Sequence, residues 1–346
     1  MGRRFESFHP DQPPFNATSM PLPHRLSRRR ALLSVAAGLA PLAARTQAVF
    51  PERPITLVVP FAPGGIADLC ARAVGQAMAG VLQQAVVVDN KPGAGAITAA
   101  TAVLQAPHDG HTLLLLSNAN AVSPALFKQL PFDVQRDFAP VSLIGRFDLG
   151  LFVAPDSRFA SLRDLVAFGR ANPGKLSIAT IAPGSTQHLA AQLFKRQAGV
   201  FAVTVPYRGT PAVVQALRSG EVDLVFEILG PQLGQVQARA LRVLAVSADQ
   251  RLADLPNVPT VQQAGVAGYD VSSWNALAVP VRTPPAARQR LHAAAQQALR
   301  DDAVVQRLRA LGVRPQGSTP EQLATLLASE TRRWGAVVRD ARIELE

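Results

Sequence analysis

Short apolar runs rich in Val, Ile and Leu alternate along this chain with segments in which apolar residues recur every three or four positions. The first pattern predicts buried strands, and the second predicts helices with one buried face. The strands are expected at residues 55–59, 85–88, 113–116, 149–154, 176–179, 202–206, 224–226 and 241–246. This alternation predicts parallel sheets with helices on both faces, which is an α/β fold.

The first expected strand breaks at a proline and glycine turn that opens directly into a helix. The turn comprises Phe61, Ala62, Pro63, Gly64, Gly65, Ile66, Ala67 and Asp68. The first turn of a helix leaves about four backbone N–H groups without partners, and the helix dipole adds roughly half a positive charge there. This turn is therefore a candidate site for a carboxylate or phosphate, with a purely structural glycine turn as the alternative.

Three further turns, at residues 117–120, 182–188 and 207–211, follow apolar strands in the same way. Ligands of open parallel sheets lie beyond the carboxyl ends of the strands, so all four turns are expected to face one crevice. The candidate ligand contacts in the three later turns are Ser117, Asn118, Ala182, Gly184, Ser185, Thr186, His188, Tyr207, Arg208 and Gly209.

Several of these side chains have an alternative role. Ser185 suits the cap of the helix that begins near Thr186, and His188 can be a buried structural histidine. Arg208 can be an exposed surface residue instead of a bidentate partner of an anion. Asp68 cannot favourably contact a second carboxylate at neutral pH. It is expected to complement the helix N-terminus, or to accept a hydrogen bond from an amino group or water.

The first 48 residues have the pattern of a secretory signal peptide. Four arginines between positions 25 and 30 precede an apolar run at residues 31–40, and Thr46-Gln47-Ala48 ends the segment with small residues. The run is too short to span a bilayer. The arginine cluster also resembles a twin-arginine export signal, and Met20 would give a more ordinary start. A buried helix is the alternative, but it leaves the arginines unexplained, so we expect export to the periplasm by one of the two routes.

Charge and cysteine content narrow the function. The signal segment carries seven arginines and two acids, and therefore five of the eleven net positive charges of the chain. The remainder is mildly basic and has no block of like charge, so nucleic acid or a membrane surface is not the expected partner. Cys70 lies on the apolar face of the first helix and is expected to be a buried, inert thiol. No metal or dinucleotide motif is present, so no cofactor is expected.

About 300 residues remain beyond the signal segment, enough for two domains with separate cores. Extended segments near residues 140–145 and 274–280 are expected to form the hinge between them. Thr319-Pro320-Glu321-Gln322 is a capping box with proline at the first helical position, so it predicts the start of a final scaffold helix.

A family resemblance covers essentially the whole chain beyond the signal segment. The matching landmarks are Pro51-Glu52-Arg53-Pro54-Ile55, Phe61-Ala62-Pro63-Gly64-Gly65-Ile66-Ala67-Asp68, Asn90-Lys91-Pro92-Gly93-Ala94-Gly95, Pro107-His108-Asp109-Gly110-His111-Thr112-Leu113-Leu114, Tyr207-Arg208-Gly209, Gly220-Glu221-Val222-Asp223-Leu224, Leu255-Pro256-Asn257-Val258-Pro259-Thr260 and Gly268-Tyr269-Asp270. With these motifs the sequence resembles the substrate-binding proteins of tripartite tricarboxylate transporters, the TctC or Bordetella uptake gene (Bug) family.

The resemblance implies a two-lobed periplasmic binding protein (Venus-flytrap) fold. Each lobe would be a mostly parallel sheet flanked by helices, and two crossover strands would join the lobes. Lobe 1 would comprise residues 49–145 and 273–346, and lobe 2 residues 146–272. The resemblance also implies a periplasmic monomer that captures a small organic carboxylate and delivers it to the integral-membrane permease subunits of a tripartite tricarboxylate transporter.

In such relatives, backbone amides and ordered water at the turn matching residues 61–68 hold the carboxylate. Domain closure around the ligand is the expected mechanism. Three positions depart from the usual family pattern: Arg208, Glu227 and Asn275. These departures concern the distal half of the ligand, and Glu227 is a further candidate contact there.

Two other functions remain open at this point. A periplasmic ligand sensor that presents its ligand to a two-component system would use the same fold. An exported hydrolase would need a nucleophile and a base, for which Ser185 and His188 are the only local pair, and no nucleophile-elbow motif surrounds that serine.

Overall fold

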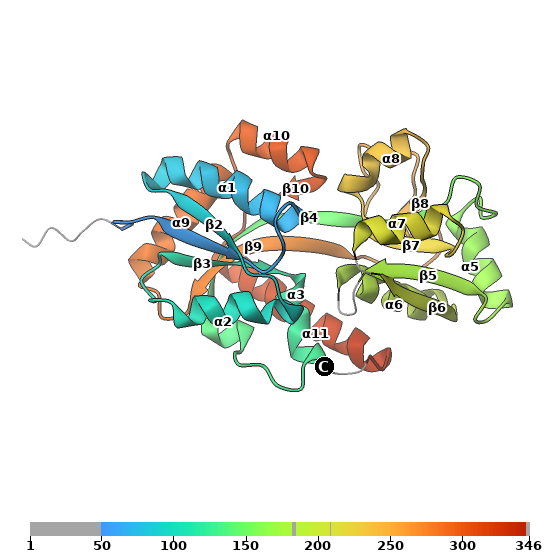
Figure 1. Ribbon diagram of the computed structural model, residues 1–346, viewed down its shortest axis with the longest axis horizontal. Helices are drawn as coiled ribbons and strands as arrows, with labels where there is room; N and C mark the ends of the chain where they lie inside the picture. The colour runs from blue at the N-terminus through green and yellow to red at the C-terminus, as the bar shows by residue number, and fades with distance from the viewer. Residues whose placement is uncertain (1–49, 182–184, 208, 344–346) are drawn as a thin grey trace, which may run out of the picture. The chain divides into compact units, whose positions relative to one another are not determined.

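The computed structural model describes residues 50–181, 185–207 and 209–343. The predicted signal peptide and the candidate contacts Ala182, Gly184 and Arg208 lie outside the described residues. Figure 1 shows two groups of strands and helices connected by long strands. We refer to them as the first lobe, which contains the start of the chain described here, and the second lobe.

The first lobe contains three parallel strands in the order β2, β1, β3. Their bounds are β1 Ile55–Val59, β2 Val86–Asn90 and β3 Thr112–Ser117. The helices that follow them in the chain are α1 Ile66–Leu82, the short η1 Ala94–Ala96, α2 Ile97–Gln105, α3 Asn118–Leu126 and α4 Val134–Asp137. Later chain adds α9 Pro285–Ala298, α10 Asp302–Ala310, β10 Val313–Pro315 and α11 Pro320–Asp340.

The second lobe repeats this plan with three parallel strands in the order β6, β5, β7. The strands are β5 Leu176–Ile181, β6 Ala202–Tyr207, β7 Leu224–Ile228 and the antiparallel β8 Arg242–Val246. The helices are α5 Leu162–Ala171, α6 Thr186–Ala198, α7 Thr210–Arg218, η2 Gly230–Gln232 and α8 Leu233–Gln237.

Two long strands, β4 Phe138–Val153 and β9 Ser272–Pro280, run between the lobes. They pair with each other antiparallel from Phe138 to Asp148, and from Leu149 onward β4 pairs with β7 and β8. The sequence pattern did not reveal this antiparallel pairing. The pairing is antiparallel because β4 leads the chain out of the first lobe, whereas β9 leads it back next to β4.

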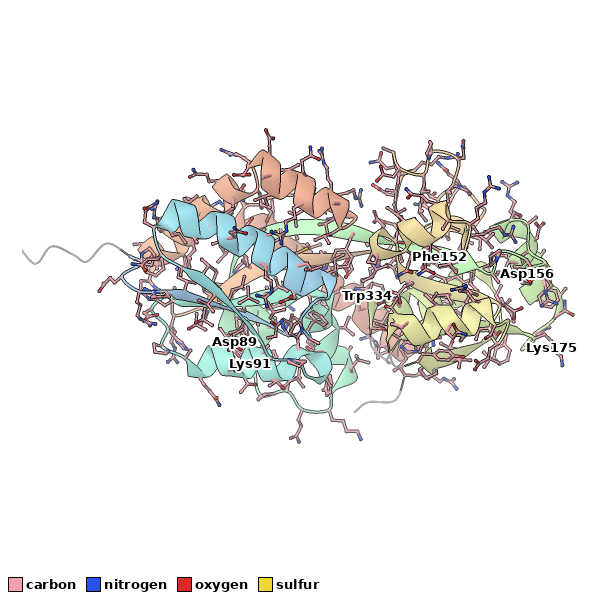
Figure 2. All side chains as sticks on the ribbon, turned by 45° about the horizontal axis from the view of Figure 1, so that its top comes forward. Asp89, Lys91, Phe152, Asp156, Lys175 and Trp334 are labelled. Atoms are coloured by element: carbon pink, nitrogen blue, oxygen red, sulfur yellow. The ribbon has the colours of Figure 1, made fainter. Side chains whose placement is uncertain are left out.

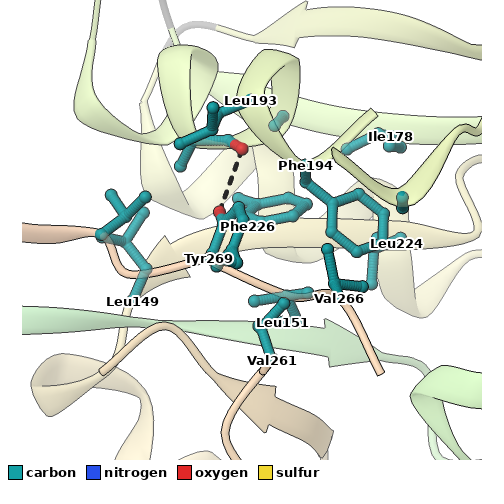
Figure 3. Close-up of a cluster of buried hydrophobic side chains, with 14 of the residues drawn as sticks. Leu149, Leu151, Ile178, Leu193, Phe194, Leu224, Phe226, Val261, Val266 and Tyr269 are labelled. Atoms are coloured by element: carbon teal, nitrogen blue, oxygen red, sulfur yellow. Dashed lines mark hydrogen bonds between the residues drawn. The ribbon is translucent and has the colours of Figure 1, made fainter. Parts of the chain in front are cut away.

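Apolar side chains cover both faces of each sheet. In β1, Leu57 and Val59 point into the core formed with α1, α9 and α10, while Val58 points into the core formed with α2 and α3. In β4, Leu151 joins the core beneath α5 and α6, and Phe152 joins the opposite core with α7. Figure 3 shows the former core, in which the buried Tyr269 hydroxyl donates a hydrogen bond of 3.0 Å to the Ala190 carbonyl.

The last helix belongs to both cores. Thr319 caps α11 as predicted: its side chain accepts the Gln322 N–H, and Gln322 accepts the Thr319 N–H at 2.9 Å. Leu323 and Leu327 pack in the first lobe, whereas Trp334, seen in Figure 2, packs in the core of the second lobe with Val338. The second half of α11 thus packs against residues of both lobes, because the same cluster also holds Val122 and Leu126 of α3. The predicted lobe boundaries stay a prediction.

Within the part of the chain that the structure describes, no helix is both long enough and apolar enough to cross a membrane.

Candidate functional site

The first residues of four helices line one cavity of about 520 Å³. They are Ile66 of α1, Asn118 of α3, Thr186 of α6 and Thr210 of α7, and each helix follows a parallel strand of its lobe. The positive ends of four helix dipoles therefore converge on the cavity from both lobes. This arrangement favours a bound anion without requiring a cationic side chain.

The turn before α1 presents backbone to the cavity through two glycines. Gly64 has a φ of 83°, which strongly favours glycine. Gly65 is the N-cap of α1 and has no side-chain cap hydrogen bond. The amides at the start of this helix are therefore without a capping side chain, and Gly65, Ile66 and Ala67 line the cavity.

The Asp68 side chain holds this turn in place by a hydrogen bond to its backbone. One of its carboxylate oxygens accepts the Gly64 N–H at 2.9 Å and the Arg72 Nε at 3.0 Å. Burial acts to raise the pKa of Asp68, but the hydrogen bonds from Arg72 and Gly64 outweigh it and hold the pKa below its ordinary value. Asp68 therefore stays ionised and orders the backbone of the turn instead of lining the cavity.

Polar groups at the start of α3 and α6 meet across the two lobes. The Asn118 amide donates to the Thr186 hydroxyl at 3.2 Å, and that hydroxyl lies 3.2 Å from the Ser273 hydroxyl. Two atoms of cavity-lining residues, Asn118 Oδ1 and Asn275 Nδ2, are buried without a hydrogen-bond partner among the described residues. A buried unpaired amide costs free energy, so a ligand that pairs with these atoms gains from doing so.

Glu227 is the only charged side chain among the described residues that line the cavity. It is 1% exposed, and its carboxylate accepts three hydrogen bonds. Gln187 Nε2 and the Ile228 N–H donate to one oxygen at 2.8 and 2.7 Å, and the Thr210 hydroxyl donates to the other at 2.9 Å. Burial raises the pKa of Glu227, while these donors act against the rise.

The rest of the wall is largely apolar. Apolar side chains from both lobes contribute to it: Phe61, Leu69, Phe147, Ile181, Ile228, Pro231 and Leu311. Small-molecule sites are usually apolar pockets with a few placed polar groups. This lining therefore suits a ligand that has a hydrocarbon segment between polar ends.

The structure brings ten of the sequence-predicted contacts to this cavity: Phe61, Gly64, Gly65, Ile66, Ala67, Ser117, Asn118, Ser185, Thr186 and Glu227. Six others that the structure describes are not among its lining residues: Ala62, Pro63, Asp68, His188, Tyr207 and Gly209. Each of the four predicted turns therefore has at least one residue at the cavity. The fourth turn, residues 207–211, contributes Thr210.

His188 and Tyr207 have structural contacts away from the cavity wall. His188 is buried, lies 3.1 Å from Gln192 Nε2, and has a pKa lowered to about 4 by burial and by nearby Lys195. Its backbone N–H donates to the Ser185 hydroxyl at 3.1 Å, so Ser185 caps α6, as its alternative role predicted. The Tyr207 hydroxyl donates to Glu221 at 2.7 Å. Neither side chain is among the residues that line the cavity.

Several lining residues were not among the candidate contacts. Ala119, Gln187 and Thr210 lie within the predicted turns, and the family pattern had already connected Asn275 with the distal half of the ligand. The others are Leu69, Phe147, Ile181, Ile228, Pro231, Gln232, Ser273, Ala310 and Leu311. Ser273 and Leu311 carried no usable signal, since they come from β9 and the end of α10, far from any predicted turn.

Within the described ranges, no group of three or more His, Cys, Asp or Glu residues is placed to hold a metal ion. Cys70 is buried and free, and burial raises the pKa of its thiol to about 12. The structure therefore confirms that the thiol is buried, and a raised pKa disfavours the reactive thiolate.

A two-lobed α/β fold with an apolar cavity and converging helix N-termini defines a solute-binding receptor. Residues 70–343 match the model of the tripartite tricarboxylate transporter family receptor, TctC, and the chain belongs to this family. The family resemblance and the fold expected from it are both confirmed. The family is one of periplasmic solute receptors and not of enzymes, which removes the exported hydrolase.

Relatives agree with this assignment. The chain is 38% identical over 321 residues to the UPF0065 protein in the tcbD-tcbE intergenic region of Pseudomonas sp. strain P51, covering 92% of this chain and 96% of that protein. It resembles the periplasmic binding protein BugD with a TM-score of 0.75 and 28% identity, over 86% of this chain and 100% of the other. Rpa4515 of R. palustris, solved with adipate, gives a TM-score of 0.77 and 32% identity over the same shares.

Proposed function

We propose that this protein is exported to the periplasm, binds a small organic carboxylate in the cavity and delivers it as a monomer to the integral-membrane permease subunits of a tripartite tricarboxylate transporter. The observation that carries the proposal is the meeting of four helix N-termini at one apolar cavity, where no described lining residue is a cation. The adipate bound by a relative supports the same ligand chemistry.

Ligand-driven closure is the proposed mechanism. The α1 turn lies on the first lobe, whereas the starts of α6 and α7 lie on the second, so one ligand that contacts both walls holds the lobes together. Such a ligand shifts the equilibrium toward the closed form by the difference between its affinities for the two forms. The Asn118 to Thr186 hydrogen bond is a contact that closure would make and opening would break.

Replacing Gly65 by valine tests the site. A Cβ at this position would lie 3.7 Å from the nearest atom, the Ala62 carbonyl oxygen, and the φ of −77° suits a side chain. The free protein is therefore expected to melt at nearly the wild-type temperature. The branched side chain would occupy the space above the α1 amides, so stabilisation by carboxylates should be lost.

The measurement is a thermal-shift screen of the processed protein against mono-, di- and aminocarboxylates. A ligand at one hundred times its Kd adds about 2.7 kcal/mol of stability to the wild type. Gly80→Val is the matched control, because Gly80 lies at the exposed end of the same helix with no atom within 4 Å of its Cβ position. If Gly65→Val responds to the acids as the wild type does, the α1 turn is not the site.

Export is tested separately. The full chain, expressed in a Gram-negative host, is expected in the periplasmic fraction as a species shortened near Ala48. Recovery of the uncut chain in the cytoplasm would contradict the proposed signal peptide.

A further inference from the structure

We propose that Glu227 makes this receptor selective for ligands with one carboxylate and a distal hydrogen-bond donor, above all an ammonium group, over ligands with two carboxylates. The inference rests on the proposed function, because it takes the first carboxylate to sit at the α1 turn.

The charges around the cavity lead to this inference. Among the described lining residues there is one anionic side chain and no cationic one. Arg72, the cation nearest the α1 turn in sequence, is already paired with Asp68. The α1 amides can serve one carboxylate. A second carboxylate near the starts of α6 and α7 would meet Glu227, because Gln187 of α6 and Thr210 of α7 both donate to that side chain.

The side chains that donate to Glu227 also carry hydrogen-bond acceptors. Gln187 and Thr210 both line the cavity, and each donates a hydrogen bond to Glu227. Their remaining capacity toward a ligand includes the Gln187 carbonyl oxygen and the lone pairs of the Thr210 hydroxyl. A ligand group that donates hydrogen bonds can use these atoms, whereas a carboxylate cannot.

Glu227 itself has room for one more donor. An ionised carboxylate offers about four acceptor positions, and three are occupied by Gln187, Ile228 and Thr210. These three donors point at the ionised form and hold its orientation. An ammonium group in the fourth position makes a charge-assisted hydrogen bond, which is shorter and stronger than a neutral one.

A second carboxylate meets the opposite situation. Two carboxylates that share a buried site repel each other, and one must take up a proton before both can stay. Glu227 is 1% exposed, so water screens this repulsion little.

Titration calorimetry at pH 7.5 with ligands matched in length tests the inference. The probes are 4-aminobutanoate, succinate and butanoate, then 6-aminohexanoate, adipate and hexanoate. In the wild type, the amino acid of at least one set should bind tenfold or more tightly than the diacid of that set. In Glu227→Gln this preference should fall to threefold or less, because the charge is removed while the shape is kept.

Two further variants separate charge from folding. Glu227→Asp keeps the charge and should keep the preference for the amino acid. Glu221→Gln is the matched control, since Glu221 is an exposed partner of Tyr207 that does not line the cavity, and it should bind as the wild type does. Melting curves of each variant verify folding.

The outcomes distinguish this inference from the proposed function. If the diacids bind as tightly as the amino acids and Gly65→Val removes both, the function stands and the role of Glu227 is overturned. That result would point to a cation such as Arg208, which lies outside the described residues, as partner of the second carboxylate. Selectivity that persists in Glu227→Gln also overturns the inference. If no carboxylate binds, the proposed function fails with it.

Discussion

Individual residues show how differently buried carboxylates can be used in one protein. Asp68 is 2% exposed and accepts hydrogen bonds from Arg72 and a backbone amide, so its charge is compensated beside the α1 turn. Glu227 is equally buried but accepts only uncharged donors. The first fixes the shape of the site, and the second is the one acidic side chain among the described residues that line the cavity.

Removing the Asp68 carboxylate should weaken both stability and binding. In Asp68→Ala, the Gly64 N–H and the Arg72 guanidinium lose their shared acceptor, so we expect a loss of about 1 to 3 kcal/mol in unfolding free energy. Ligand affinity should also fall, because the turn is no longer held. Denaturant titration and calorimetry measure the two effects.

Asp89→Ala is the control for this change. Asp89 of β2 forms a partly exposed ion pair with Lys91 at 3.1 Å, and both residues are labelled in Figure 2. Such pairs contribute about 0 to 1 kcal/mol. A loss in Asp68→Ala no larger than in Asp89→Ala would contradict the role assigned to Asp68.

Asp148 predicts a pH dependence of stability. It is 4% exposed at the point where β4 passes from the first lobe to the second, and it is paired with Arg314 at 3.0 Å. Burial raises its pKa to about 6, with Asp249 and Asp270 raising it further and Arg314 opposing the rise. The folded chain therefore takes up a proton below about pH 6, whereas the unfolded chain does so near its ordinary value of 3.8.

The wild type should accordingly gain stability relative to Asp148→Asn by about 1 to 3 kcal/mol as the pH falls from 7 to 4. His188 acts in the opposite direction, because its lowered pKa removes stability as the pH falls below 6.5. That effect is present in both chains and cancels in the comparison. Denaturant unfolding at several pH values measures the difference, with the exposed Asp156→Asn as control. A pH-independent difference would show that Asp148 titrates normally.

At the scale of elements, one local unit is used repeatedly: a strand, a short turn and a helix whose first residue faces the cavity. Its signals lie next to one another in the chain, so the sequence predicted β1, β3, β5 and β6 and the turns after them. The antiparallel strands β4 and β9 were harder to predict. They are buried on both sides, and a continuous apolar run carries no information about strand direction.

The cap of α11 is expected to stabilise the whole protein. Thr319→Ala removes the acceptor of the Gln322 N–H, which costs about 0.5 to 2 kcal/mol. Since α11 packs in both cores, we expect one cooperative transition moved to lower denaturant concentration. Thr325→Ala on the exposed face of the same helix should be neutral or slightly stabilising. Equal effects of the two changes would argue against the cap.

At the scale of the whole molecule, a close backbone contact joins the lobes beside the cavity. A Cβ at Gly230 in η2 would overlap the Leu311 carbonyl oxygen and would lie 2.7 Å from Gly312 Cα. Backbone atoms cannot give way as a flexible side chain can, so no side chain fits there without movement of one segment. Leu311 and Pro231, the neighbour of Gly230, both line the cavity.

Gly230→Ala should therefore weaken ligand binding through the geometry of the lobes and not through a lost contact. We expect roughly a tenfold rise in Kd, which corresponds to about 1.4 kcal/mol. Calorimetry with the best ligand of the screen measures it. Gly234→Ala is the control, since no atom lies within 4 Å of a Cβ there. An unchanged Kd in Gly230→Ala would mean that this contact is not needed for closure.

The sequence by itself determined the α/β fold, the family, the four turns and the capping of α11, because each depends on residues that are close together in the chain or on a motif read in order. Only the tertiary structure decided that Ser273 and Leu311 reach the cavity and that Glu227 is its single charged side chain among the described residues. It also decided that α11 belongs to both cores and that Asp148 is buried. These properties depend on which distant segments pack together, and burial, charge pairing and cavity shape exist only after that packing has formed.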